Sequence, residues 1–385
     1  MQTRSARAET GPATGCGAPS GLAGCRRQNR CELVRRVAVP LALVAAVVSG
    51  PGPSSAAEAP RLRVVKTYEL PRPLRWAWDV RWATDGSVLL AAGRQGVVEL
   101  TLDTGAVTPA LPASGALNFL AANQIGRSRR YVAAGGIFFA VAWKPADRPA
   151  SQKDVFAISA VSDIDVRGDQ LLVLGAQMED DGQWCADGAL AWLGSLDRGF
   201  ADAHPVLFST AGPGAANAGR CAAFELGKAR FLPGGGFVVV PGVDRGVYLY
   251  GRDGTLQKTW QTETLGIDSG CTISKAQERL LARDPRARWA WLDARRLVDE
   301  ILPLPSGPAL VVRSVRDGVT LWEIEALADD GTARSSPVPV TSPSGWSHLR
   351  GDVRGDRVVL LRLESGTMEE APAAPPQLIV AEIVR

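Results

Sequence analysis

The string VRGDQLLVL at residues 166–174 recurs almost unchanged at residues 353–361, where it reads VRGDRVVLL. In each copy, Gly-Asp follows a segment in which apolar and polar residues alternate, and it precedes a short apolar run, 171–174 or 358–361. Strand-forming segments on both sides of a two-residue turn that contains glycine predict a β-hairpin. Because the copies lie far apart in the chain, they predict one structural unit that is repeated within a larger fold.

The same pattern of short strands and glycine-rich turns recurs elsewhere in the chain. The clearest unit runs from Trp78 to Gly105, with turns at Asp85-Gly86 and Gly93. The spacing between units is roughly 40–50 residues, which is the period of propeller blades. The sequence therefore predicts an all-β fold, a six-bladed β-propeller, whose other units begin near Leu117, Ser162, Phe224, Val298 and Ser347.

One further strand precedes the first full unit. Residues 61–70 read RLRVVKTYEL, and the last unit ends in the apolar run 378–384. An N-terminal strand that completes the last blade closes the ring and removes the exposed sheet edges of a linear array. We therefore expect residues 61–70 to pair with the last unit.

Residues 274–297 depart from the β pattern. Ser274 and Gln277 have the spacing of a capping box, and Asp284-Pro285 offers an N-cap followed by a proline in the first turn. These signals predict a short helical insertion between blades four and five. The arginines of this segment could hold an anionic ligand, but the acids among them favour an ordinary solvated helix face.

The N-terminus has the pattern of an export signal. Arginines are frequent up to Arg36, an apolar stretch covers residues 37–48, and Ser55-Ala56-Ala57 provides small residues for cleavage. The apolar stretch is about 12 residues, which is short for a membrane span. We expect residues 1–57 to be a signal peptide and leader, and residues 58–385 to form the propeller in the periplasm or outside the cell. A membrane-anchored N-terminus is the alternative.

The amino-acid composition excludes some classes of protein. Hydrophobic residues make up 46% of the chain and charged residues 22%, which is too apolar for a disordered chain. Residues 1–57 hold seven arginines, so the net charge of residues 58–385 is close to zero. This charge gives no indication of nucleic-acid binding. We expect a monomer without a transmembrane segment in the mature chain. Its remaining cysteines would form one disulfide and leave one free thiol, with the pairing open among Cys185, Cys221 and Cys271.

The sequence holds few signals of catalysis. It lacks the nucleophile motif GxSxG, the zinc motif HExxH and the phosphate-binding motif GxxxxGK[ST]. It contains only two histidines, His204 and His348. These observations favour a binding protein over an enzyme.

Polar side chains stand near the start of the predicted inner strand of every unit. Inner strands line the channel of a propeller, so these side chains could converge at one mouth and bind a ligand. Acids gathered there would need a cation, arginine partners such as Arg81, or raised pKa values. The alternative is that such positions are simply solvated. The candidates are Asp79, Asn118, Asp163, Glu225, Glu300 and His348, with Asp165 and Asp299 as neighbours.

In its repeat pattern, residues 60–385 resemble the six-bladed β-propeller superfamily that includes NHL-repeat, TolB-like and gluconolactonase-like proteins. The gluconolactonase-like branch holds a metal with Glu, Asn and Asp side chains from different blades. By that resemblance, a calcium site would use Glu225, Asn118, Asp163 and Asp79, because calcium prefers hard oxygen ligands. The Gly-His and Trp-Asp signature of WD-repeat blades is absent.

Two functions remain open at this point. The first is an exported, non-catalytic propeller that binds a ligand or a protein partner on its funnel face. The alternative is a calcium-dependent hydrolase or lactonase with its site at the channel mouth.

Overall fold

The computed structural model describes the chain between residues 60 and 384, with gaps. These residues belong to one compact unit of the chain, Ser55–Arg385. Their secondary structure is mainly β-strand, arranged in six four-stranded sheets. The described residues are 60–93, 95–111, 119–124, 131–135, 139–143, 155–157, 160–176, 189–196, 198, 202–208, 227–242, 246–268, 273–328, 332–342, 347–364 and 375–384.

Each sheet is numbered here in chain order, and its strands are given from the centre outward. Sheet 1 contains β2 (Asp79–Trp82), β3 (Val88–Ala91), β4 (Val97–Leu100) and β5 (Val107–Leu111). Sheet 2 contains β6 (Phe119–Gln124), β7 (Tyr131–Gly135), β8 (Phe139–Trp143) and β9 (Val155–Ala157). Sheet 3 contains β10 (Ala160–Arg167), β11 (Gln170–Ala176), β12 (Ala189–Ser195) and β13 (His204–Phe208). Sheet 4 contains β14 (Lys228–Phe231), β15 (Phe237–Val240), β16 (Gly246–Tyr250) and β17 (Leu256–Gln261). Sheet 5 contains β18 (Leu297–Leu304), β19 (Gly307–Arg316), β20 (Val319–Leu327) and β21 (Ala333–Ser342). Sheet 6 contains β22 (Ser347–Arg354), β23 (Arg357–Glu364), β24 (Gln377–Val384) and β1 (Arg61–Glu69).

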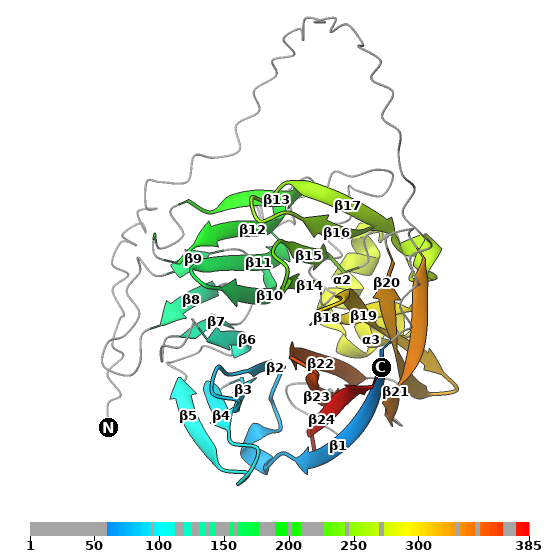
Figure 1. Ribbon diagram of the computed structural model, residues 1–385. Coiled ribbons are helices and arrows are strands. Elements are labelled where there is room, and N and C mark those ends of the chain that lie inside the picture. Colours follow the sequence, from blue (N-terminus) through cyan, green and yellow to red (C-terminus); the bar gives the residue numbers. More distant parts are fainter. Residues whose placement is uncertain are drawn as a thin grey trace, which may run out of the picture. The chain divides into compact units, whose positions relative to one another are not determined.

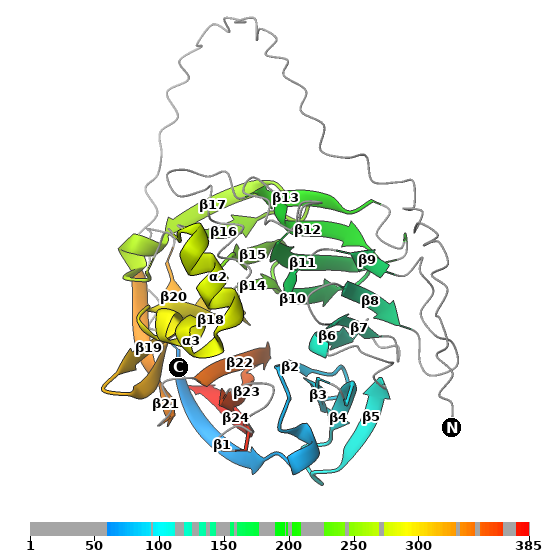
Figure 2. The same ribbon diagram turned by 180° about the vertical axis from the view of Figure 1, so that it is seen from behind.

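The six sheets surround a common centre, as Figures 1 and 2 show. The inner strands β2, β6, β10, β14, β18 and β22 contact one another in this order, and β22 contacts β2 again. This arrangement is that of a β-propeller, so the predicted all-β propeller fold is confirmed.

Sheet 6 joins the two ends of the described chain. β1 pairs antiparallel with β24, from Arg61 opposite Val384 to Glu69 opposite Gln377. The backbone N–H of Leu70 then donates to the carbonyl of Pro376 at 3.1 Å. β23 pairs with one edge of β24, and a strand from the other end of the described chain covers the second edge.

The two repeated strings form equivalent hairpins. Arg167 lies opposite Gln170 in the β10–β11 hairpin, and Arg354 lies opposite Arg357 in the β22–β23 hairpin. The glycine of each turn has a positive φ, which is 62° at Gly168 and 65° at Gly355. A first turn residue with positive φ matches the twist of the flanking strands and explains the glycine in both strings.

The hydrophobic core lies between neighbouring sheets. In β11, Leu172 and Leu174 belong to a buried cluster with Phe237 of sheet 4, whereas Leu171 belongs to one with Val132 of sheet 2. Successive strand residues point to opposite faces, and both faces of this strand are covered. An unbroken apolar run therefore marks a middle strand here, where an alternating pattern would mark a half-exposed strand.

Two short helices lie in sequence between β17 and β18. In α2 (Lys275–Arg283), the Ser274 hydroxyl accepts from the N–H of Gln277 at 3.1 Å, as the capping-box spacing predicts. In α3 (Pro285–Asp293), the Asp284 carboxylate accepts from the N–H of Arg286 at 2.9 Å. Among the described residues, no helix is long and apolar enough to cross a membrane.

The two faces of the ring carry different connections. Because the strands of each sheet alternate in direction, every inner strand begins on one face, here called the top face. Figure 2 looks onto this face, with α2 and α3 in front. The connection from β17 to β18, which contains α2 and α3, joins strands on the top face, whereas the two-residue turns at 168–169 and 355–356 lie on the opposite face.

Candidate functional site

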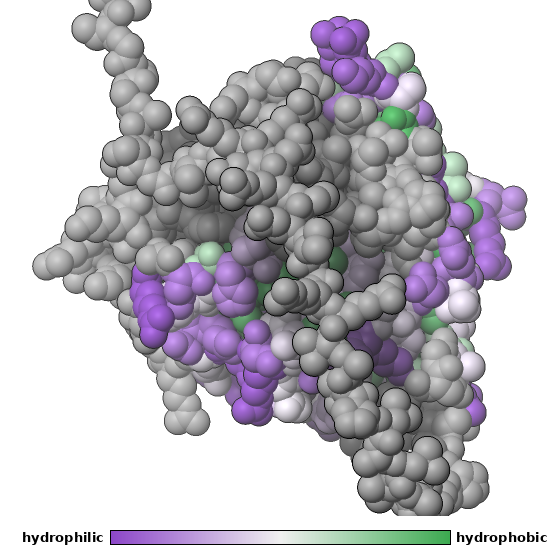
Figure 3. Space-filling view, turned by 90° about the horizontal axis from the view of Figure 1, so that it is seen from above, coloured by the Kyte–Doolittle hydropathy of each residue, from purple (hydrophilic) through white to green (hydrophobic). Residues whose placement is uncertain are grey.

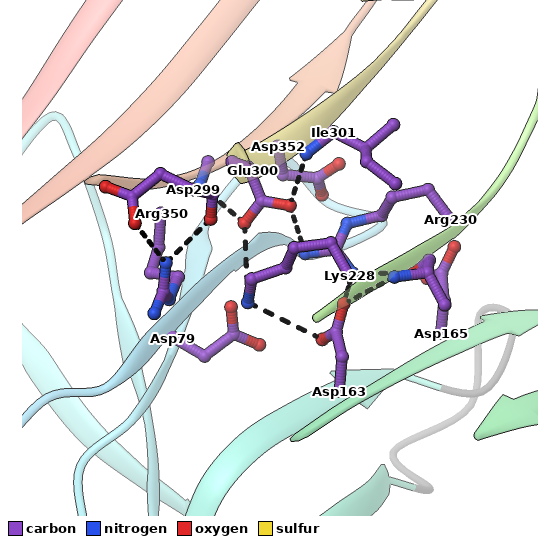
Figure 4. A network of polar contacts seen from close by, with 12 residues as sticks. Asp79, Asp163, Asp165, Lys228, Arg230, Asp299, Glu300, Ile301, Arg350 and Asp352 are labelled. Carbon is purple, nitrogen blue, oxygen red and sulfur yellow. Dashed lines mark hydrogen bonds and ion pairs between the residues drawn. The ribbon is translucent and has the colours of Figure 1, made fainter. Parts of the chain in front are cut away.

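A network of charged side chains lies along the inner strands at the centre of the ring (Figure 4). Nearly all of these side chains are buried. Figure 4 shows Asp163 and Glu300 on opposite sides of Lys228 and Arg230. The network comprises Asp79 and Arg81 of β2, Asp163 and Asp165 of β10, Lys228 and Arg230 of β14, Asp299 and Glu300 of β18, and His348, Arg350 and Asp352 of β22.

Asp163 has the largest number of cationic partners in this network. It is fully buried and forms an ion pair with the Arg230 guanidinium. Its Oδ1 accepts from Nη2 of Arg81 at 3.2 Å and lies 4.0 Å from Nζ of Lys228. Burial alone would raise the pKa of this carboxyl, but Arg230, Lys228 and Arg81 outweigh burial and lower it to about 2. Asp163 is therefore ionised and held by its partners.

Arg230 connects three inner strands. From β14 it pairs with Asp163 of β10, and its Nη2 donates to Oε1 of Glu300 on β18 at 2.6 Å. The second oxygen of Glu300 accepts from the N–H of Gly351 at 3.2 Å. One guanidinium between two buried carboxylates compensates charges that would otherwise repel each other across the axis.

Asp79 is less completely satisfied than Asp163. Its Oδ1 accepts from Nη1 of Arg81 at 2.8 Å, while its buried Oδ2 has no hydrogen-bond partner in the structure. Burial raises the pKa of Asp79, and Arg81 opposes this only in part. Arg81 thus lies between Asp79 and Asp163, the two described members of the calcium set that the resemblance implies.

Several of these polar side chains join neighbouring sheets. Carboxylate oxygens of one inner strand accept backbone N–H groups of the next, and Arg230 joins sheets 4 and 5. Between sheets 2 and 3, the Asn123 amide donates to Asp165 at 2.7 Å. The carboxylate–backbone contacts are Asp163 with Ala229 at 3.0 Å, Asp165 with Phe231 at 2.7 Å, Asp299 with Leu349 at 2.8 Å, Glu300 with Gly351 at 3.2 Å and Asp352 with Trp82 at 2.8 Å.

This pattern corrects the alternative that such positions are merely solvated. Asp79, Asp163 and Glu300 are each at most 2% exposed. Asp163 and Glu300 bind arginine and backbone N–H groups of neighbouring inner strands, whereas Asp79 binds Arg81 of its own strand. Buried carboxylates are stable only when they are paired and hydrogen-bonded. Asp163 and Glu300 therefore join neighbouring sheets through these contacts.

His348 is linked to the network through Asp299. Nδ1 of His348 lies 2.9 Å from Oδ1 of Asp299, and the Trp322 indole donates to Oδ2 of Asp299 at 2.7 Å. Burial lowers the pKa of His348 to about 4 although Asp299 acts in the opposite direction. Burial would raise the pKa of Asp299, but His348 and Arg350 hold it well below its usual range. At neutral pH the pair is an imidazole beside a carboxylate.

Replacing His348 with glutamine is expected to flatten the pH dependence of stability between about pH 4 and 6.5. The unfolded chain binds a proton at His348 in this window while the folded chain does not, so stability falls as the pH is lowered. The pKa shift corresponds to about 3 kcal/mol at most. Urea unfolding at several pH values measures this slope. The exposed His204→Gln variant is the control, and parallel profiles for His348→Gln and the parent protein would contradict the assignment.

The structure brings together Asp79, Asp163 and Glu300, and places His348 next to them through Asp299 and Arg350. Asn118 and Glu225 lie outside the described residues, as do the three cysteines of the expected mature chain. Their predicted functions stay predictions. Four residues of the network were not predicted from the sequence: Lys228, Arg230, Arg350 and Asp352. Lys228 and Arg230 are two residues apart, as are Arg350 and Asp352, and this spacing puts both side chains of a pair on the same face of a strand.

The described part of the predicted calcium set does not fit a divalent cation. Asp79 and Asp163 share Arg81, and Asp163 also faces Arg230 and Lys228. A cation bound between these carboxylates would meet three positive groups. Within the described ranges, no group of three or more His, Cys, Asp or Glu side chains could hold a metal ion.

Comparisons with known proteins give likenesses in fold. No family model and no curated protein matches the sequence. Virginiamycin B lyase from Staphylococcus aureus aligns over 84% of this chain and 100% of its own, with 8% identity and a TM-score of 0.43. A DUF4221 family member from Bacteroides vulgatus aligns over 85% of this chain and 98% of its own, with 7% identity and a TM-score of 0.49. No activity is transferred from such distant structures.

Proposed function

We propose that this protein is an exported six-bladed propeller that binds a ligand or protein partner on its top, funnel face and catalyses no reaction. In this proposal, residues 1–57 are removed as signal peptide and leader, and residues 58–385 form the ring. β1 closes the ring, and α2 and α3 form the helical insertion between blades four and five. Six four-stranded sheets and the pairing of β1 with β24 support this organisation.

The observation that carries the non-catalytic part is the pairing of the axial carboxylates. A general acid or base must reach the substrate and exchange a proton with it. Asp163 and Glu300 are fully buried and bind arginine and backbone N–H groups. Their contacts support a function in stability, which leaves recognition to the surface.

The connections on the top face support this face as the binding surface. Connections on a rigid scaffold carry binding residues in many folds, and the described connection with α2 and α3 lies on this face. Figure 3 looks instead at the rim of the ring, where the coloured surface is mainly hydrophilic and hydrophobic residues appear only in small separate areas.

Metal content and calcium-dependent stability test this proposal against the hydrolase alternative. We expect purified protein without stoichiometric calcium and with an unchanged melting temperature when calcium is added. Bound calcium that is lost in the Glu225→Gln variant and retained in the exposed control Glu69→Gln would support the hydrolase and contradict the proposal. The test therefore covers Glu225 and Asn118 as well as the described acids.

Export predicts a defined N-terminus. Cleavage after Ala57 would give mature protein that begins near Glu58, because small residues precede this position. Intact-mass measurement of protein recovered from the periplasm or the medium measures the N-terminus. Mature protein that retains residues 1–36 would show that this segment is not a cleaved signal.

A further inference from the structure

A depression opens on the top face between the 3₁₀ helix η1 (Arg72–Leu74) and the β3–β4 turn. Its cavity volume is about 420 Å³, enough for a small molecule. η1 connects β1, the outer strand of sheet 6, with β2, the inner strand of sheet 1. The depression is lined by Arg72, Pro73, Arg75, Trp76, Ala92 and Gln95.

The lining combines positive charge with an aromatic wall. Arg72 and Arg75 are exposed, and no described acid forms an ion pair with either guanidinium. The Arg75 guanidinium lies 5.5 Å from the centre of the Trp76 ring, and Trp76 is half-buried. A guanidinium can form two parallel hydrogen bonds with one carboxylate, and an indole packs against flat rings.

The backbone around the depression is held in place. Leu74 and Ala77, which adjoin the lining residues in sequence, are buried, and the N–H of Ala77 donates to the carbonyl of Leu74 at 2.9 Å. On the other wall, the N–H of Gln95 donates to the carbonyl of Ala92 at 3.0 Å. Along residues 72–77, Leu74 and Ala77, three residues apart, are thus buried, while Arg72, Pro73 and Arg75 are exposed and Trp76 is half-buried. Such preorganisation lowers the entropic cost of binding.

We propose that this depression binds a small organic acid that carries its carboxylate on a ring. Arg72 and Arg75 bind the carboxylate, Trp76 and Pro73 pack against the ring, and the Gln95 amide binds a polar substituent. Aromatic acids and uronic acids share this chemistry. The inference rests on the proposed binding function and adds a position and a ligand class to it.

Ligand-observed NMR titration of the full mature protein with benzoate and with glucuronate tests the site. We expect saturable binding of at least one acid, and at least tenfold weaker binding of its neutral analogue, benzamide or glucose. Arg72→Ala and Arg75→Ala should each weaken binding of the acid at least tenfold, as expected for loss of a charge-assisted hydrogen bond. The exposed Arg316→Ala variant is the matched control and should bind like the parent protein.

The preferred acid identifies the source of the carboxylate. Binding of benzoate alone indicates an aromatic acid, and binding of glucuronate alone indicates an acidic sugar. Absence of saturable binding by both acids, or affinity unchanged in Arg72→Ala and Arg75→Ala, would overturn the inference. Because all substituted side chains are exposed, each variant should unfold at the parent temperature, which thermal melting checks. The calcium measurement is independent of this site, so failure here leaves the proposed binding function to its own test.

Discussion

Replacing Arg230 with methionine is expected to lower the free energy of unfolding by about 3 to 5 kcal/mol. The substitution removes the guanidinium that lies between Asp163 and Glu300 and leaves two buried carboxylates facing each other. Lys228 compensates only in part, because its Nζ lies 4.0 Å from Asp163 and 3.9 Å from Glu300. Urea unfolding followed by fluorescence measures the change.

A matched control and a second substitution identify the cause. Arg316→Met removes an exposed arginine and should change stability by no more than about 0.5 kcal/mol. Adding Glu300→Gln to Arg230→Met should restore part of the lost stability, because it removes one of the uncompensated charges. If Arg230→Met cost less than about 1 kcal/mol, the network would not hold the inner strands together as described.

Deletion of residues 61–69 is expected to lower the melting temperature by many degrees and to expose β24 to protease. The deletion removes one of the four strands of sheet 6 and leaves the backbone groups of β24 unpaired at an open edge. It also removes the hydrogen bond from the Tyr68 hydroxyl to the carbonyl of Leu102, 2.7 Å long, which joins sheet 6 to sheet 1.

Thermal melting and limited proteolysis with mass spectrometry measure both effects. Val65→Thr changes an exposed residue of the same strand without removing the pairing, so it should melt like the parent protein. An unchanged melting temperature and no new cleavage within 377–384 after the deletion would show that the ring does not depend on β1.

The propeller fold could be predicted because its signals are local. The turn glycines and apolar runs of the two VRGD strings define hairpins without reference to the rest of the chain, and Ser274 and Asp284 cap helices within a few residues. The pairing of residues 61–69 with the last strand is a non-local contact. It followed from the argument that an open ring would leave sheet edges exposed.

The site could be predicted only in part. The position of Asp79, Asp163 and Glu300 on inner strands is a local property, and it placed them near one another. Burial of Lys228 and Arg230 is not local, because charged residues in a strand are ordinarily exposed. Only the order of strands around the axis puts Arg230 between the acids of β10 and β18. A function in holding the sheets together could not be separated from ligand binding before that order was known.

The pairing of β1 with β24 also determines when sheet 6 can be completed during synthesis of the chain. β1 is the first described strand to leave the ribosome, and its partner is the last. Until residues 377–384 have been made, β1 has no strand to pair with and sheet 6 consists of β22 and β23 alone. A chain truncated anywhere before them would therefore present an open strand at its beginning and an incomplete ring at its end. Contacts between distant parts of a chain form slowly, so completion of sheet 6 is expected to be a late step of folding, and its absence marks an unfinished molecule.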